Sequence, residues 1–269
     1  MTHIAFIQSC LVETSKIATS KFGRVKGKLK EGDKNQVLTE VDLAIGALIT
    51  EKIKQEFPTY NIIDEETGVV DNQSDFTWVI DPIDGTSNYA MGVPSYGIMI
   101  GLLNGTTPIA GGFALPFTNE ITIAEKGQGT FCNGKAISVT NEPELINCLV
   151  AYHIDGHPEE PVRTQEEVVL LGEIILRVRN MRNSGAEPLD GFYVAIGKYG
   201  GLLNRSMRIW DIVAPHIIIQ EAGGVVTDFW GQPVDYSDPL TKATQHFTIC
   251  AAPPQLHKQL QDIINKTAK

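Results

Sequence analysis

The chain has 269 residues, of which 42% are hydrophobic and 20% are charged, a balance typical of a soluble globular protein with one large domain or two interlocked ones. The formal net charge of −10 argues against nonspecific binding to a nucleic acid polymer or an anionic membrane, because that affinity comes from clustered Lys and Arg. No apolar run approaches the roughly 20 residues that span a bilayer and the N-terminus does not resemble a secretory signal, so we expect a cytoplasmic protein.

The four cysteines, Cys10, Cys132, Cys148 and Cys250, are scattered along the chain. They form no Cys-x-x-Cys pair and no Cys/His spacing that indicates zinc. We therefore expect free thiols.

In the first half of the chain, apolar spacing predicts a helix over 3–22 and a second from Val41 to Phe57, where Pro58 stops it. Thr39 and Asp42 resemble a capping box at the start of the second helix. Short β-rich segments separated by Gly, Asn and Pro then predict an antiparallel sheet. These segments are 61–64, 77–81, 96–103, 108–114 and 120–125.

In the second half, strands and helices alternate. The expected strands are 148–152, 224–228 and 247–252, and the expected helices are 163–180, 186–198, 211–222 and 255–266. Because no repeat or flexible linker separates the halves, we expect a subdomain of residues 1–145 and one of residues 146–269, joined near 140–147, that form one continuous unit.

The most informative motif follows the apolar strand around Trp78. Asp81 and Asp84 lie three residues apart, with Pro82 fixing φ and Gly85 freeing it, so the chain can turn and direct both carboxylates and the Ile83 carbonyl toward one point. Mg²⁺ prefers such oxygen ligands.

The residues after Asp84 are small. Gly85, Thr86 and Ser87 can expose backbone N–H groups at a helix N-terminus, which favours a bound phosphate. The alternative is an ordinary hairpin or Asx turn, because Asp, Pro and Gly are common turn residues.

Two further acidic segments join this motif as candidates. Glu65 and Glu66 follow an apolar strand, although a solvated turn would explain them equally well. Asp211 stands at an expected helix start, where an N-cap role is the alternative.

Three segments together resemble the inositol monophosphatase family, part of a magnesium-dependent, lithium-sensitive phosphatase superfamily that includes fructose-1,6-bisphosphatase and bisphosphate nucleotidase. They are IIDEETG (62–68), WVIDPIDGTSNY (78–89) and IWDIVAPHIIIQEAGG (209–224). Weaker matches elsewhere extend the resemblance over nearly the whole chain. It implies an α/β (α+β) fold, a layered αβαβα sandwich.

The resemblance also implies a set of metal ligands. Glu65, Asp81 and the Ile83 carbonyl would hold a first Mg²⁺, and Asp81, Asp84 and Asp211 a second, with Glu65 reaching a weaker third ion through water. Such cations would also offset the charge of an acidic protein that acts on an anionic substrate.

The catalytic residues implied by the resemblance are Thr86, Asp42 and Glu65. Thr86 would hydrogen-bond the attacking water and Asp42 would orient Thr86, although helix capping alone could explain Asp42. Gly85, Thr86 and Ser87 would bind the phosphate. Glu66 is expected to support the ligands rather than bind metal.

The chain departs from the family pattern near the ligands. Asp64 replaces the usual glycine before the acidic pair and adds negative charge. Pro215 follows Asp211 closely and makes the helix geometry there less certain. His216 is expected to be a buried structural residue.

Four residues are candidates for substrate binding: Glu187, Asn204, Arg205 and Arg208. Asn204 stands where inositol-specific members have an acidic residue, which weakens inositol specificity. Arg205 and Arg208 could bind a second phosphate, or they could be solvated or paired with carboxylates. Glu187 could contact a sugar hydroxyl or cap a helix.

The sequence therefore predicts Mg²⁺-dependent hydrolysis of a small phosphomonoester, with inositol monophosphate or a related polyol or sugar phosphate as first choice. The alternatives are fructose 1,6-bisphosphate, 3′(2′),5′-bisphosphate nucleotide or histidinol phosphate specificity, and a noncatalytic metal and phosphate binder. By resemblance we also expect lithium sensitivity and a homodimer.

Overall fold

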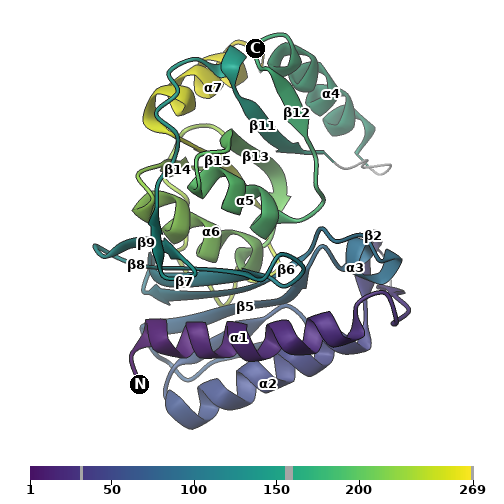
Figure 1. The fold of residues 1–269 in the computed structure, drawn as a ribbon, viewed down its shortest axis with the longest axis vertical. Coiled ribbons are helices and arrows are strands. Elements are labelled where there is room, and N and C mark those ends of the chain that lie inside the picture. The colour runs from purple at the N-terminus through teal and green to yellow at the C-terminus, as the bar shows by residue number, and fades with distance from the viewer. Residues whose placement is uncertain (31–32, 155–159, 268–269) are drawn as a thin grey trace.

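The computed structural model describes residues 1–30, 33–154 and 160–267. Five layers of helix and sheet alternate along the long axis of the molecule (Figure 1). Helices α1 and α2 lie outside an eight-stranded sheet, α5 and α6 lie between that sheet and a five-stranded one, and α4 and α7 cover the far side. This confirms the expected layered α/β sandwich.

The two outer helices agree with the sequence pattern. Helix α1 spans His3–Lys21 and α2 spans Glu40–Glu56, and each buries one apolar side against the eight-stranded sheet. The capping box at the start of α2 is present. A two-stranded sheet, β1 (Lys28–Lys30) and β2 (Asp33–Leu38), precedes α2 and was not expected.

The eight-stranded sheet has the order β10-β9-β8-β7-β6-β5-β3-β4. Its strands are β3 (Asn61–Asp64), β4 (Gly68–Val70), β5 (Phe76–Asp84), β6 (Gly97–Asn104), β7 (Thr107–Leu115), β8 (Glu120–Glu125), β9 (Gly129–Cys132) and β10 (Lys135–Ile137). The expectation of a purely antiparallel sheet is wrong at one place, because β3 and β5 run parallel. The hairpin partner β4 occupies the outer edge of β3, so β5 joins β3 on its other side.

The five-stranded sheet is mixed, with the order β12-β11-β13-β15-β14. Its strands are β11 (Leu149–His153), β12 (Asn180–Arg182), β13 (Tyr199–Met207), β14 (Val225–Thr227) and β15 (Phe247–Ala252), and a 3₁₀ turn at Leu145–Asn147 precedes it. Strands β12 and β13 were not expected. The helix expected over 163–180 ends earlier, because the chain at Asn180 pairs with the edge of β11 instead.

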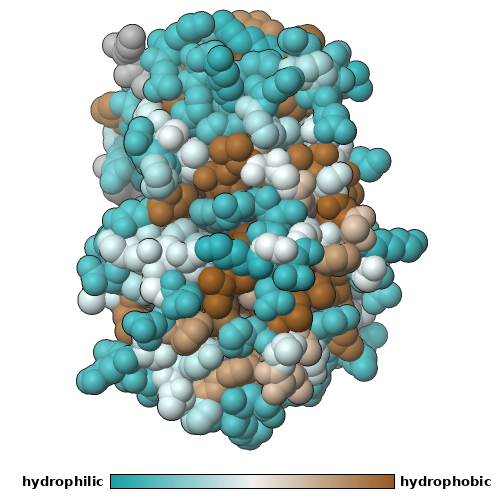
Figure 2. All heavy atoms as spheres, turned by 90° about the vertical axis from the view of Figure 1, so that its left-hand side faces the viewer, coloured by the Kyte–Doolittle hydropathy of each residue, from teal (hydrophilic) through white to brown (hydrophobic). Residues whose placement is uncertain are grey.

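The helices of this half are α4 (Pro161–Ile175), α5 (Glu187–Ala195), α6 (Ile209–Glu221) and α7 (Pro254–Thr267). Among the helices in the described part of the chain, none is both long enough and apolar enough to cross a lipid bilayer. On the face shown in Figure 2, hydrophobic side chains gather around the middle of the molecule, whereas hydrophilic ones cover most of its upper part.

Helix α6 is mostly apolar and packs against strands of both sheets. Glycines on the eight-stranded sheet let it come close: a Cβ on Gly101 would lie 2.5 Å from Val213, and one on Gly111 would lie 2.6 Å from Ile217. Larger residues at these positions would push α6 away from the sheet. This close packing positions the first turn of α6 beside the end of β5.

Candidate metal and phosphate site

Three carboxylates predicted as metal ligands lie together between the two sheets. Asp81 and Asp84 come from the end of β5, and Asp211 comes from the first turn of α6. One oxygen from each lies within 4.8 Å of the others. We call these three residues the carboxylate cluster.

Local backbone geometry directs these side chains. The strand expected over 77–81 continues to Asp84 in β5, where the motif predicts a turn. Its pairing with β6 shifts register between Asp81 and Asp84, and such an irregularity redirects side chains within a strand. Asp211 is the third residue of α6, and its Oδ2 accepts the N–H of Arg208 at 2.6 Å. The helix expected to start at Asp211 thus starts two residues earlier, with Arg208 as its N-cap residue.

Pro215 lies within α6 and does not break it. Because proline has no backbone N–H, the carbonyl of Asp211 cannot receive the usual helical hydrogen bond from residue 215. The neighbouring α5 leaves room for the proline ring, since a Cβ on Gly191 would still lie 3.6 Å from it.

The carboxylate cluster concentrates negative charge in a buried place. Burial is the main cause that raises the pKa of Asp81, Asp84 and Asp211, and neighbouring carboxylates raise these pKa values further. Asp81 is 2% exposed, and its Oδ1 has no hydrogen-bond partner among the described residues. Clustered oxygen ligands that need a counter-charge fit a hard divalent cation such as Mg²⁺.

Glu65 lies at the end of β3, beside the carboxylate cluster. Its N–H donates to the carbonyl of Ile80 on β5 at 3.2 Å, and its charge contributes to the raised pKa of Asp81 and Asp211. Glu65 is therefore placed where its charge acts on the cluster.

Asp64 serves the turn that carries Glu65. Its Oδ1 accepts the backbone N–H groups of Glu66 at 2.9 Å and Thr67 at 2.7 Å, and the side chain is 1% exposed. It also lies against α2, where a Cβ on Gly46 would come within 2.7 Å of its Oδ2. The unusual aspartate thus makes an Asx turn behind the acidic pair.

Asp42 caps α2 and also contacts the Thr86 hydroxyl. Its Oδ2 accepts the N–H of Thr39 at 2.9 Å as part of the capping box, and it also bonds the Thr39 hydroxyl. Its Oδ1 lies 3.1 Å from the Thr86 hydroxyl. Burial raises the pKa of Asp42, although the hydrogen bonds from Thr39 and Thr86 oppose that effect.

Thr86 has two acceptors within reach, Asp42 and the carbonyl of Ile83 at 2.7 Å. A hydroxyl has one proton, so it donates to one of them at a time. If a cation takes the Ile83 carbonyl, the Thr86 proton can turn to Asp42, which leaves the lone pairs of the hydroxyl to accept a hydrogen bond.

Gly85 joins β5 to α3 (Thr86–Met91) in the left-handed conformation, with φ of 79°. A Cβ there would lie 2.8 Å from the carbonyl of Ser95, so no larger residue fits without movement. The first helical bond runs from the N–H of Tyr89 to the carbonyl of Gly85. The N–H groups of Thr86 and Ser87 precede that bond and are not used by the helix.

A second group of polar residues adjoins the carboxylate cluster: Glu187 and Asp190 on α5, His153 on β11 and Asn204 on β13. We call it the polar cluster. The N–H of Glu187, at the start of α5, donates to Asp84 Oδ1 at 2.9 Å. Glu187 Oε1 accepts from Asn204 Nδ2 at 2.6 Å and lies 2.9 Å from His153 Nδ1, and the other ring nitrogen bonds Asp190.

Opposite charges in the polar cluster stabilise one another's ionised forms. Burial by itself raises the pKa of Glu187, but the His153 charge and hydrogen bond lower it to about 2. Burial likewise lowers the pKa of His153, but Glu187 and Asp190 raise it well above its ordinary value. A doubly protonated His153 between two carboxylates explains both the lowered pKa of Glu187 and the raised pKa of His153.

The two arginines proposed for substrate binding are engaged elsewhere. Arg205 faces α4, 3.7 Å from Glu166 and 3.9 Å from Glu167. Its guanidinium lies 5.4 Å from the ring centre of Trp230. The Arg208 guanidinium bonds the carbonyl of Thr244. Neither guanidinium has a contact with the carboxylate cluster, although the Arg208 backbone binds Asp211 and its charge lowers the pKa of that aspartate.

His216 has the structural setting that the sequence predicts. Its Nδ1 lies 2.9 Å from the hydroxyl of Tyr236, and burial lowers its pKa to about 4. The glycines of the turn before β9 are also structural, because the N–H groups of Gly127 and Gly129 donate to the carboxylate of Glu221 at 2.9 and 3.0 Å.

His153 and Asp190 were not found from the sequence. His153 follows the strand expected over 148–152 and ends the observed β11. The parallel pairing of β11 with β13 sets it opposite Asn204, a contact between residues far apart in the chain. Asn88 lies in the central motif but was given no role, and its Nδ2 donates to the carbonyls of Ser95 and Ser184 at 2.8 and 2.9 Å.

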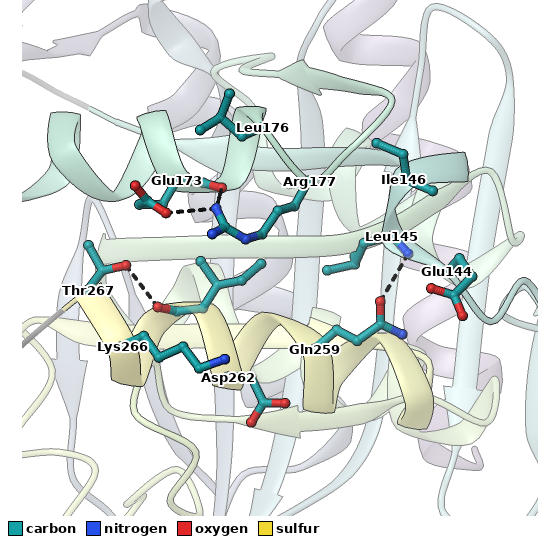
Figure 3. Close-up of a pocket in the computed structure, with 11 residues that line it drawn as sticks. Glu144, Leu145, Ile146, Glu173, Leu176, Arg177, Gln259, Asp262, Lys266 and Thr267 are labelled. Atoms are coloured by element: carbon teal, nitrogen blue, oxygen red, sulfur yellow. Dashed lines mark hydrogen bonds and ion pairs between the residues drawn. The ribbon is translucent and has the colours of Figure 1, made fainter.

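A separate pocket of about 440 Å³ lies between α4, α7 and the 3₁₀ turn (Figure 3). Its lining mixes apolar side chains such as Leu176 with charged ones, among them Arg177, which bonds Glu173 at 2.7 Å. It shares no residue with either the carboxylate cluster or the polar cluster.

Comparisons with known proteins agree with this fold. The model of the Inositol monophosphatase family matches residues 3–268. The chain is 32% identical over 239 residues to "Fructose-1,6-bisphosphatase/inositol-1-monophosphatase" of Aquifex aeolicus, covering 88% of this chain and 89% of that one. It is 30% identical over 226 residues to "Nus factor SuhB" of Xylella fastidiosa, covering 84% and 80%.

Among solved structures, an inositol monophosphatase of Thermotoga maritima aligns with a TM-score of 0.85 at 27% identity, covering 100% of this chain and 98% of that chain. The fold, the acidic segments and these matches lead to one assignment: the chain belongs to the inositol monophosphatase family.

Proposed function

We propose that this chain is a Mg²⁺-dependent phosphatase that hydrolyses a small phosphomonoester, with inositol monophosphate or a related polyol or sugar phosphate as substrate. The observation that carries the proposal is the convergence of Asp81, Asp84 and Asp211 within 4.8 Å, next to Thr86 paired with Asp42. The first arrangement suits cations and the second suits control of a water molecule.

The proposed ligands are those of the family pattern. Glu65, Asp81 and the Ile83 carbonyl would hold one ion, and Asp81, Asp84 and Asp211 would hold another, with Glu65 reaching a weaker third ion through water. Bound Mg²⁺ supplies a water of lowered pKa and neutralises charge on phosphoryl oxygens. The raised pKa values of the carboxylate cluster support this role, because burial and mutual repulsion leave it in need of positive charge.

The remaining steps belong to the side chains of this protein. Asp42 accepts a hydrogen bond from the Thr86 hydroxyl, so the oxygen of Thr86 can accept a hydrogen bond from the water that attacks phosphorus. The N–H groups of Gly85, Thr86 and Ser87 bind phosphate oxygens at the start of α3. Glu66 supports the turn that carries Glu65.

The polar cluster offers a place for the rest of the substrate. Glu187 binds Asp84 through its backbone N–H and the Asn204 amide through its carboxylate. The Glu187 and Asn204 side chains would bind hydroxyl groups next to the phosphoester. A hydroxyl that donates to a carboxylate forms a charge-assisted hydrogen bond, which is stronger than a neutral one. This supports a polyol or sugar phosphate over a simple alkyl phosphate.

Fructose-1,6-bisphosphatase specificity is the second candidate, because the name of the Aquifex aeolicus relative includes that activity. A second phosphate requires free cationic groups, and the Arg205 and Arg208 guanidinium groups already have other partners. We therefore rank this specificity below a monophosphate. A noncatalytic role ranks lower still, because Thr86 and every proposed ligand are retained.

A phosphate-release assay tests the proposal. The purified protein should release phosphate from at least one compound in a panel of inositol, sugar, nucleotide and histidinol phosphates, and only with Mg²⁺ present. Asp84→Asn should lose about a thousandfold in turnover, since a metal contributes several kcal/mol to such a reaction. Unchanged turnover in a folded Asp84→Asn protein contradicts the proposal.

A further inference from the structure

The imidazole of His153 lies between two acidic side chains. Its Nδ1 is 2.9 Å from Glu187 Oε1, and its Nε2 bonds Asp190 Oδ2. The His153 side chain is 7% exposed and that of Asp190 is 0% exposed. An imidazole that donates from both nitrogens carries a positive charge, and ionised carboxylates can only accept. The contacts therefore make His153 the cation of a buried ion triad.

Glu187 needs this cation because of its surroundings. Its backbone N–H binds Asp84, and its negative charge is a cause, after burial, of the raised pKa of Asp84. The two carboxylates therefore repel each other when both are ionised. His153 Nδ1 and Asn204 Nδ2 both hold Oε1, at 2.9 and 2.6 Å. Two donors on two adjacent strands thus oppose the repulsion.

The strands that carry these donors are in register. His153 on β11 pairs with Asn204 on β13, so both side chains approach Glu187 from neighbouring positions in the sheet. The backbone fixes the separation between the donors. The orientation of the Glu187 carboxylate is therefore set by the sheet rather than by a loop.

Asp190 connects this arrangement to the other half of the molecule. Its Oδ2 also accepts the hydroxyl of Ser184 at 2.7 Å. The carbonyl of Ser184 in turn accepts from Asn88 Nδ2 at 2.9 Å and from the Ser95 hydroxyl at 3.0 Å. A continuous set of hydrogen bonds thus runs from the start of α3 to His153.

We propose that His153 is a positioning residue that, backed by Asp190, holds the Glu187 carboxylate against the phosphatase site so that it accepts a hydrogen bond from a substrate hydroxyl. This rests on the proposed function for its substrate, and it assigns His153 and Asp190 a part in specificity. His153 itself does not touch the reacting phosphate.

The test compares His153→Gln with wild-type protein on two substrates. Glutamine is neutral and can donate to one carboxylate only. With inositol 1-phosphate, or whichever polyol or sugar phosphate the wild type prefers, KM should rise about tenfold, the size expected for a charge-assisted hydrogen bond, while kcat changes little. With para-nitrophenyl phosphate, which has no hydroxyl beside the ester, both constants should stay near wild type.

His257→Gln is the matched control. His257 is also buried and its Nε2 lies 2.9 Å from the Thr227 hydroxyl, in the outer layer, so this variant should leave both substrates unaffected. If His153→Gln does not fold, Asp190→Asn replaces it and should give the same pattern with a smaller rise in KM. Equal losses on both substrates would overturn the proposal.

A double variant tests whether His153 affects KM through Glu187. Adding His153→Gln to Glu187→Gln should change KM no further, because His153 acts through Glu187. Independent effects that multiply would overturn the positioning role.

A crystal structure of His153→Gln separates this inference from the proposed function. The Glu187 carboxylate should move away from Asn204. A Glu187 that keeps its position refutes the inference even in an active enzyme, whereas a wild type that releases no phosphate refutes only the proposed function.

Discussion

The carboxylate cluster and the polar cluster lie side by side, but they are built differently. Asp81 and Asp84 are neighbours in the sequence, and only Asp211 joins them from a distant helix. The polar cluster combines the end of β11, the start of α5 and the middle of β13. A local motif positions the carboxylate cluster, which we call the motif side of the site. Contacts between distant strands and a helix position the polar cluster, which we call the pairing side.

The difference separates residues that a sequence motif supplies from residues that only the fold brings together. On the motif side, the register shift of β5 and the left-handed Gly85 shape the backbone around Asp81 and Asp84. On the pairing side, the geometry of Glu187 and Asn204 depends on contacts between distant segments. We expect the chemistry to depend on the first side and substrate choice on the second.

The largest effect after loss of a metal ligand should come from Thr86. Thr86→Val removes the hydroxyl and should lower kcat by about a hundredfold with every substrate, the usual size of a lost acid–base contribution. Thr86→Ser keeps the hydroxyl and should retain most of the activity. Steady-state kinetics measure both variants. A Thr86→Val protein with near wild-type kcat would show that the Thr86 hydroxyl has no part in catalysis.

A smaller effect should mark Arg205 as structural. Arg205→Met leaves the buried Glu167, which is 1% exposed, with fewer cationic contacts, so the free energy of unfolding should fall by about 1–3 kcal/mol. Kinetics on para-nitrophenyl phosphate should not change. Chemical denaturation measures the loss.

Arg177→Met is the control for that experiment. Arg177 pairs with Glu173 on the surface, with side chains 47% and 42% exposed, and should cost less than about 0.5 kcal/mol. If Arg205→Met instead raised KM for a bisphosphate alone, Arg205 would belong to substrate binding as first expected from the sequence.

The smallest effect should be a pH dependence of stability from His216. Burial lowers its folded pKa to about 4, below an unfolded value of about 6.5. The unfolded state therefore binds more protons between these values, and stability falls as pH falls through that range. The loss between pH 7.5 and 5.5 should be about 1 kcal/mol.

Thermal unfolding of His216→Gln measures this contribution. The variant should lose less stability than wild type over the same pH range, because glutamine does not titrate. An identical pH slope in both proteins would show that His216 is not the responsible group.

Much of this architecture could be predicted, for identifiable reasons. Helices α1 and α2 and strands β6 to β8 have clear periodic patterns of apolar residues. The motif around Asp81 indicates a metal and phosphate site by its acidic and small residues. Strand β12 could not be predicted, because Asn180–Arg182 continues a helical pattern and becomes a strand only through pairing with β11. The parallel pairing of β3 with β5 likewise depends on β4 taking the sheet edge.

Local sequence motifs predicted part of the site, whereas contacts that depend on strand pairing could not be predicted. Sequence spacing indicated Asp42 and Thr86 through a motif and a cap, and the structure brings them within 3.1 Å. Nothing local marks His153 as a partner of Glu187, since that contact requires β11 and β13 to be in register. Arg205 was expected in the substrate pocket because it follows Asn204 in the sequence. In the structure its guanidinium lies near Glu166 and Glu167 of α4, a contact that the sequence did not indicate.

The position of α6 between the two sheets makes the carboxylate cluster a property of the assembled molecule. Asp81 and Asp84 belong to the eight-stranded sheet, and Asp211 belongs to α6. The distance between these carboxylates therefore depends on how closely α6 packs on the sheet at Gly101 and Gly111. A newly made chain with only its first half folded lacks the third carboxylate. Uptake of cations would therefore report the completion of folding, and each cation bound would in turn hold the two halves closed.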